Sequence, residues 1–179
     1  MKNEGDKFEI MTMEQLELEP FGSGKRSNKY IHDATLGDHK FELKSCSGES
    51  GKISTGRGVS HNKLEAWRNV DWIFSVRDNG VIQRHILVTK SRMEELFSKI
   101  QSKIEDPGPK SKFAGTKEIP DLKHALRQHG YSESKVEKIC NTFERGTRLN
   151  DPRLSLSDVE RLGVVVKSKA DIERAKANE

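Results

Sequence analysis

The chain has few cysteines and no long apolar segment, and both shortages exclude classes of protein. Its two cysteines, Cys46 and Cys140, lie far apart in a chain of 179 residues, so neither a disulfide framework nor a cysteine metal site is predicted. The N-terminal residues lack the apolar segment of a signal peptide, and no run of about 18 apolar residues is available to span a bilayer. We therefore expect a reduced, cytoplasmic protein with no membrane partner.

Several signatures of well-known sites are also missing. The six histidines and two cysteines show no zinc spacing. The glycine-rich stretch 48–58 lacks the Gly-Lys-Ser/Thr ending and the strand-to-helix setting of a nucleotide-binding loop. A nucleophile elbow is not found either. The sequence therefore predicts no zinc site, no Walker or Rossmann site and no serine hydrolase site.

Charge is abundant, whereas apolar residues are few. Hydrophobic residues make up 32% of the chain and charged residues 34%, so we expect a modest core in one domain, with room for a small appendage. The net charge is +4, which suits nucleic acid or another anion. Residues 1–21 carry a net charge of −4, but residues 22–68 carry +4. A surface that binds a phosphate backbone needs such a local excess of positive charge.

Helical and strand periods alternate along the first hundred residues. The pattern predicts helices over 12–19, 60–70 and 91–104, and strands over 29–34, 39–46, 71–76 and 81–89. A capping box at Thr12 and Gln15 marks the expected start of the first helix, and Pro20 marks its end. Trp67 and Trp72 are expected in the core.

The clearest break in the chain is the Pro- and Gly-containing stretch that begins at Asp106. Beyond it, the pattern predicts helices near 120–129, 132–145 and 155–162, a short strand at 164–166 and a frayed, charged tail from Lys167. We therefore divide the chain into a core over 1–105, a linker over 106–118 and a helical C-terminal subdomain over 119–179. This order of elements indicates an α/β (α+β) fold with a small helical appendage.

Residues 30–45 are the most informative stretch. Asp33 follows a short apolar run, a turn comes at 36–38, and a strand-like segment then carries Glu42, Leu43 and Lys44. Because side chains alternate along a strand, Glu42 and Lys44 point to one face and Leu43 to the other. If the two segments pair as a hairpin, Asp33 approaches Glu42. Two carboxylates beside a lysine suit Mg²⁺ and hydrolysis of a phosphodiester. A solvated strand face is the alternative, since Glu-x-Lys is a common tripeptide.

Asp33-Ala34, then Phe41-Glu42-Leu43-Lys44-Ser45, then Trp72-Ile73-Phe74 resemble the motif of the PD-(D/E)xK nuclease superfamily, and within it the orthodox Type II restriction endonucleases. The resemblance covers roughly residues 25–120. His32 stands where the leading proline of the motif would be.

The resemblance implies a restriction-endonuclease-like mixed β-sheet flanked by helices, and a Mg²⁺-dependent cut of double-stranded DNA. Asp33, Glu42 and the backbone carbonyl of Leu43 would be metal ligands, and Lys44 would position the attacking water and stabilise charge on the phosphate. It also suggests a homodimer on a short palindromic site. A cognate DNA methyltransferase would be its functional partner in a restriction–modification system.

Other residues are candidates for contact with DNA or metal. The segment after the Glu-x-Lys strand reaches the bases in similar enzymes, and its candidates here are Ser54, Thr55, Arg57, His61, Asn62 and Lys63. These side chains suit base edges and phosphates equally well. Glu14 and Glu17 of the first helix are candidates for an extra metal ligand, or members of a solvated acidic helix. The C-terminal subdomain suits DNA contact through a helix-turn-helix-like pair, dimerisation, or a structural cap.

Three functions remain open from the sequence. The first is a Type II restriction endonuclease. The second is a structure-selective or mismatch-repair nuclease of the same superfamily, which would cut junctions or nicks. The third is a DNA-binding module without catalysis, against which the complete set of Asp33, Glu42 and Lys44 argues.

Overall fold

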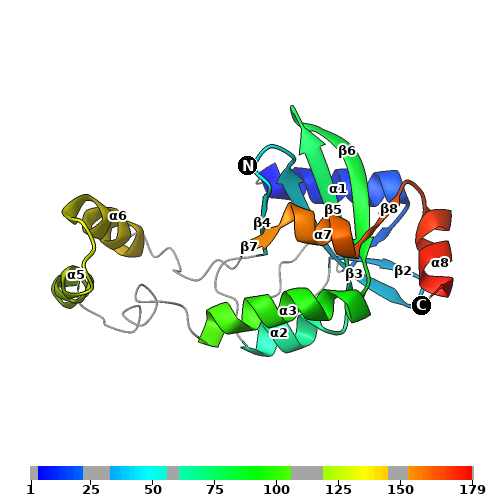
Figure 1. The fold of residues 1–179 in the computed structure, drawn as a ribbon. Coiled ribbons are helices and arrows are strands. Elements are labelled where there is room, and N and C mark those ends of the chain that lie inside the picture. The colour runs from blue at the N-terminus through cyan, green and yellow to red at the C-terminus, as the bar shows by residue number, and fades with distance from the viewer. Residues whose placement is uncertain (1–3, 22–32, 56–60, 106–118, 145–152, 179) are drawn as a thin grey trace.

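A six-stranded mixed sheet with helices on both faces organises the chain (Figure 1). The computed structural model describes residues 4–21, 33–55, 61–105, 119–144 and 153–178. The helices are α1 (Glu4–Leu16), α2 (His61–Trp67), α3 (Lys90–Glu105), α5 (Ile119–Gln128), α6 (Glu133–Glu144), α7 (Leu156–Leu162) and α8 (Lys169–Ala177). The strands are β1 (Glu19–Pro20), β2 (Ala34–Leu36), β3 (His39–Ser47), β4 (Lys52–Ser54), β5 (Asp71–Asp78), β6 (Val81–Val88), β7 (Arg153–Ser155) and β8 (Val164–Val166).

The main sheet has the order β1-β2-β3-β5-β6-β8, and β4 and β7 form a separate two-stranded sheet. Strands β3 and β5 run parallel, and the other neighbours in the main sheet run antiparallel. A parallel pair needs a crossover connection, and here β4 and α2 lie in it. The predicted mixed sheet flanked by helices is confirmed at this level. The predicted antiparallel pairs are present as β2 with β3 and β5 with β6, but β2 spans Ala34–Leu36, and residues 29–32 of the predicted strand lie outside the described residues.

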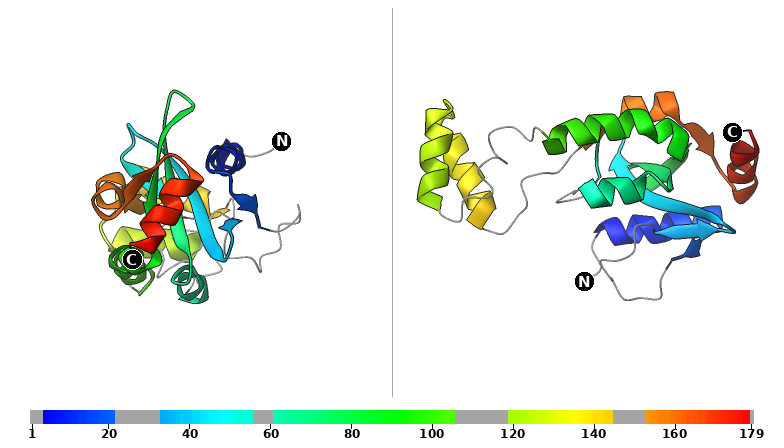
Figure 2. Two further views of the ribbon diagram at one scale, coloured as in Figure 1. Left: turned by 90° about the vertical axis from the view of Figure 1, so that its right-hand side faces the viewer. Right: turned by 90° about the horizontal axis from the view of Figure 1, so that it is seen from below.

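Two apolar layers cover the two faces of the sheet. On one face, α2, α3 and α7 pack over Cys46 of β3 and over Trp72, Phe74 and Val76 of β5. On the other, α1 and α8 pack over Phe41 and Leu43. Figure 2 shows α1 and α3 on opposite sides of the strands. Trp72 contacts Trp67, Phe74 and Phe97 at ring-centroid distances of 5.0 to 6.0 Å, so the expectation that both tryptophans are core residues is confirmed.

Helix α1 differs from its prediction. It begins at Glu4 rather than near Thr12, and Thr12 is a buried residue within it. It also ends at Leu16 rather than at residue 19, because Glu19 and Pro20 form β1. The Thr12 hydroxyl donates to the carbonyl of Phe8 at 2.8 Å, which is the back-bonding available to a threonine inside a helix. The capping-box pattern at Thr12 and Gln15 was therefore misleading, because the same residue types also fit a helix interior that faces a polar partner.

The last elements of the chain pack with the main sheet. Strand β8 pairs with β6, β7 pairs with β4, and Leu154 and Val159 belong to the core beneath α3. The charged tail, expected to fray, forms α8 and buries Ile172. This differs from the single helical subdomain predicted over 119–179, because residues 153–178 complete the sheet and its two layers.

Only α5 and α6 form the predicted helical appendage among the described residues. They enclose a small core of their own, made by Leu122, Leu126, Val136, Ile139 and Cys140. Figures 1 and 2 show the pair apart from the sheet. The predicted linker over 106–118 lies outside the described residues. In the part of the chain that the structure describes, no helix has both the length and the apolar composition needed to cross a bilayer.

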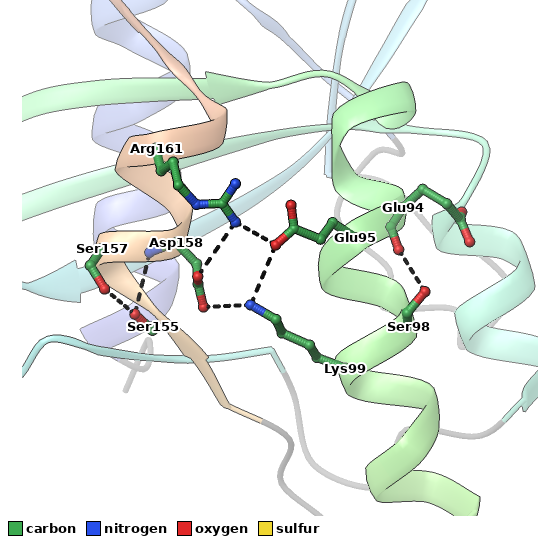
Figure 3. Close-up of polar contacts among 8 residues, drawn as sticks. All are labelled: Glu94, Glu95, Ser98, Lys99, Ser155, Ser157, Asp158 and Arg161. Atoms are coloured by element: carbon green, nitrogen blue, oxygen red, sulfur yellow. Dashed lines mark hydrogen bonds and ion pairs between the residues drawn. The ribbon is translucent and has the colours of Figure 1, made fainter.

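Charged residues fasten α7 to α3 on the outside of the molecule (Figure 3). The Lys99 ammonium lies 3.0 Å from the Asp158 carboxylate and 3.5 Å from Glu95. Arg161 pairs with the same two carboxylates. The four side chains thus alternate in sign across the contact between the helices. A network of this kind orients α7 more effectively than an isolated surface pair would.

Candidate functional site

Backbone hydrogen bonds on both sides hold Asp33 in place directly before β2. Its N–H donates to the Phe41 carbonyl at 2.8 Å, and its carbonyl accepts the N–H of Phe21 at 3.0 Å. These bonds place Asp33 one residue before β2, opposite the segment that carries Glu42. Its carboxylate oxygen Oδ2 accepts the N–H of Leu43 at 2.9 Å. The side chain is therefore directed at the centre of β3.

Glu42 and Lys44 share one face of β3, as strand alternation predicts. They stand beside Trp72 and Phe74, their partners in register on β5. Glu42 is 6% exposed, and the side chain of Lys44 is 16% exposed. The Lys44 ammonium lies 5.8 Å from the centre of the Trp72 ring. Both charges are thus held on the rim of an aromatic core, where little water screens them.

Three oxygen atoms surround the Lys44 ammonium. It donates to Glu42 Oε1 and to the carbonyl of Leu43, the latter at 2.9 Å. Asp33 Oδ2 lies 3.9 Å from the same nitrogen. The structure therefore brings together Asp33, Glu42, the Leu43 carbonyl and Lys44, which is the set that the sequence singled out.

Burial and charge act in opposite senses on this group. Burial raises the pKa of Glu42 above its usual value, and the negative charge of Asp33 adds to this, although the nearby Lys44 works to lower it. For Lys44, burial alone would lower the pKa, but Glu42 and then Asp33 outweigh that effect and raise it. A protonated, positively charged Lys44 is therefore favoured between the two carboxylates.

The donor set fits a hard divalent cation. Two carboxylates and a backbone carbonyl are all oxygen ligands, which Mg²⁺ prefers and which suit zinc poorly. Among the described residues, there is no group of three or more His, Cys, Asp or Glu side chains arranged around a metal position. A cation held here would therefore take two side chains and one carbonyl from the protein and complete its shell with water.

Glu9 of α1 is a carboxylate whose charge acts on Lys44. It was not among the residues predicted from the sequence. Glu14 and Glu17 are exposed, but Glu9 is half-buried, and its charge contributes to raising the pKa of Lys44. The omission has a simple cause. Once the helix was predicted to start at residue 12, Glu9 fell outside it, although the spacing of Phe8, Thr12 and Leu16 could have signalled the longer helix.

The predicted DNA-contact residues fall into three groups. Ser54 is exposed at the end of β4, and Lys63 on α2 lies 4.7 Å from the centre of the Trp67 ring and helps to lower the pKa of Glu42. Thr55 is 1% exposed, so its side chain does not present the surface expected of a DNA contact. Arg57 lies outside the described residues, as do the side chains of His61 and Asn62 at the start of α2.

Asp71 is a further buried carboxylate, and it lies on β5 next to the pair formed by Trp72 and Glu42. It lies opposite Phe41 and directly before Trp72. Its Oδ1 accepts the N–H of Lys90 at 2.8 Å, and Lys176 of α8 lies 3.2 Å from its Oδ2. Asp71 is thus satisfied by the start of α3 and by α8, which gives it a structural explanation.

No protein-family model matches the chain, and no curated protein matches it in sequence.

Proposed function

We propose that this protein is a Mg²⁺-dependent DNA endonuclease of the PD-(D/E)xK type, and specifically a Type II restriction endonuclease. One observation carries the proposal. Asp33, Glu42 and the Leu43 carbonyl converge on the position of the Lys44 ammonium, at 3.9 Å from Asp33 and 2.9 Å from the carbonyl. A mixed sheet flanked by helices is also compatible with the restriction-endonuclease-like fold that the motif implies.

Each group has a defined task in this proposal. The carboxylates of Asp33 and Glu42 and the carbonyl of Leu43 would hold Mg²⁺, which supplies Lewis acidity and lowers the pKa of bound water when present. The Lys44 ammonium would orient the attacking water by hydrogen bonding and offset negative charge that develops on the phosphate. The aromatic wall of Trp72 and Phe74 limits water access, which strengthens these electrostatic effects.

The neighbouring surface supports a polyanionic substrate. Lys63 lies close enough to Glu42 to affect its pKa, so its ammonium would lie beside a phosphate backbone bound at the site. Lys52 and Ser54 are exposed on β4. A double-strand cut at a palindrome would use two copies of the chain related by a two-fold axis, and α5 and α6 would serve either DNA contact or dimerisation. A cognate methyltransferase would protect the host DNA.

Digestion of long, unmethylated, sequenced duplex DNA tests this function. We expect discrete bands that require Mg²⁺ and disappear with a chelator, with one shared sequence at the fragment ends. The matched variant Glu42→Gln should keep gel-shift binding and lose the bands. Cutting confined to junctions or nicks would identify a structure-selective nuclease with the same site. Binding with no cleavage of any DNA would contradict the proposal and leave a binding module.

A further inference from the structure

Lys44 occupies the point on which the proposed metal ligands converge. Its ammonium contacts Glu42 Oε1 and the Leu43 carbonyl directly, and Asp33 Oδ2 lies 3.9 Å away. An ammonium group offers three N–H donors and one positive charge, and it seeks the same oxygen atoms that a small dication would bind.

A lysine at this point offsets the negative charge of two poorly hydrated carboxylates, which would otherwise destabilise the folded protein. Glu42 is 6% exposed, and Asp33 adds a second negative charge nearby. Without a cation, two carboxylates and a carbonyl dipole would repel one another where water screens them weakly. The Lys44 side chain, itself 16% exposed, therefore acts as a counter-ion that the chain itself supplies.

An ammonium and a dication cannot share this position, because they repel each other and use the same lone pairs. The backbone of Lys44 is fixed in β3, where it pairs with Phe74, but its four-carbon stem can rotate. Removal of the ammonium from the three oxygens would leave the lysine within reach of an anion bound at the rim of the site.

We infer that Lys44 is an exchangeable internal counter-ion: it fills the cation position of the free protein and moves out toward the substrate phosphate when a divalent cation takes that position. This inference rests on the proposed function, because it assumes that the three oxygens bind a metal. It couples occupation of the site to delivery of the lysine, so that Lys44 is free to contact phosphate only in the form able to cut.

Two measurements on the DNA-free protein test this exchange. Reductive methylation of lysines, followed by mass spectrometry, reports how accessible each ammonium is. We expect Lys44 to react slowly without metal and several-fold faster with saturating Mg²⁺, whereas the exposed Lys40 and Lys52 should react equally under both conditions. In Glu42→Gln, which lacks one ligand, Mg²⁺ should no longer accelerate the labelling of Lys44.

Calorimetric titration with Mn²⁺ supplies the second readout. Lys44→Met removes the competing ammonium and should bind Mn²⁺ about tenfold more tightly than the unaltered protein, provided that its circular dichroism spectrum is unchanged. Metal binding with Lys44 labelled at the same rate in both states would overturn the exchange and leave the proposed nuclease function intact. Failure of the unaltered protein to bind either metal would overturn both.

Discussion

At the scale of single residues, the candidate site depends on how Glu42 and Lys44 share a poorly hydrated position. Burial raises the pKa of Glu42, and the carboxylates overcome the effect of burial on Lys44. Each group would be unfavourable alone, and each makes the other acceptable. Removal of one partner should therefore lower the free energy of unfolding by more than the pair contributes to it, since a buried charge is left uncompensated.

Glu9 provides a test of how far this electrostatic environment extends. Its charge contributes to raising the pKa of Lys44, so Glu9→Gln should change the rate of DNA cleavage about two- to tenfold, as expected for one charge acting across several ångströms of protein. Single-turnover cleavage rates would measure this change.

Two exposed carboxylates at the end of α1 serve as controls for that test, Glu14 within the helix and Glu17 one residue after it. Glu14→Gln and Glu17→Gln remove exposed charges and should leave the rate unchanged. An effect of either control equal to that of Glu9→Gln would show that the overall charge of this segment, and not proximity to Lys44, is responsible.

A buried polar chain connects α1 to the sheet. Thr12 Oγ1 donates to the Phe8 carbonyl at 2.8 Å and also lies 2.6 Å from Ser75 Oγ. Ser75 Oγ lies 2.9 Å from His85 Nδ1. His85 Nε2 lies 2.9 Å from Gln15 Oε1. Because an amide oxygen only accepts, Nε2 carries the hydrogen of the neutral ring, and Nδ1 accepts from the Ser75 hydroxyl.

His85 should make stability depend on pH. Burial lowers the pKa of His85 below 6.5, so the folded protein favours the neutral ring. The contribution of the neutral His85 ring to the free energy of unfolding is fully present above pH 6.5. It is lost as the pH falls from that value toward the lowered pKa, because the unfolded chain then binds more protons than the folded one.

Urea unfolding at about pH 8 and about pH 5.5 measures this effect, with His85→Gln as a control that does not titrate in this range. The unaltered protein should lose more of its free energy of unfolding than the variant does between the two conditions. An equal loss in both proteins would contradict the assignment to His85.

The identity of the site residues was more predictable from the sequence than the positions of their side chains. Strand alternation and a hairpin turn are local properties, so the meeting of Asp33, Glu42 and Lys44 could be read from the sequence. The position of the Lys44 ammonium among the oxygens could not, because it depends on the rotamer chosen beside Trp72. The burial of Thr55 could not be predicted either, since it depends on contacts made by distant parts of the chain.

At the scale of elements, the structure relies on the return of the chain end to the sheet. Strand β8 adds to β6 through the pairs His85–Val166 and Leu87–Val164. Gly163 joins α7 to this strand. A Cβ built on Gly163 would lie 2.9 Å from the Val159 carbonyl oxygen and 3.1 Å from that of Leu87. The close approach of helix and sheet thus depends on the missing side chain.

Gly163→Ala should therefore destabilise the protein by about 1–3 kcal/mol, as overpacking against backbone does. Gly48→Ala is a matched control, because a Cβ there meets Val76 Cγ1 only at 3.6 Å. Thermal unfolding followed by circular dichroism would compare the two. A loss in Gly48→Ala equal to that in Gly163→Ala would contradict the steric explanation.

Elements with strong local patterns were predictable, and elements fixed by distant partners were not. The strands β5 and β6, with the turn between them, and the apolar stripe of α3 were predicted close to their observed bounds. The predicted start of α1 was wrong, because a threonine followed by a glutamine three residues later fits both a helix start and a buried helix interior. The pairing of β4 with β7 joins segments about a hundred residues apart, which no local pattern reports.

At the scale of the whole molecule, the chain leaves the sheet after α3, forms α5 and α6, and returns at β7. The helical pair has its own apolar core, and the returning segment supplies Leu154, Leu156 and Val159 to the core of the sheet. The two parts should therefore differ in what they contribute to folding.

Two deletions test this organisation. Replacement of residues 106–152 by a short Gly/Ser linker should leave a cooperatively unfolding protein, since the contacts between β7, α7 and the sheet remain. Truncation after residue 118 removes α5 and α6 as well, together with β8 and the core residues of α7. This shorter protein should not unfold cooperatively. Circular dichroism melts would compare them. A stable truncated protein would show instead that residues 119–179 form one separate subdomain.

The central claim is that Asp33, Glu42 and Lys44 form a site that hydrolyses DNA. The most direct measurement is the single-turnover cleavage of duplex DNA with Mg²⁺ by the unaltered protein, Glu42→Gln and Lys44→Met, with gel-shift affinity and circular dichroism recorded in parallel. The site predicts that each substitution reduces the rate by a factor of about a hundred or more, with a folded protein that still binds DNA. Cleavage at an unchanged rate in either folded variant would contradict the account.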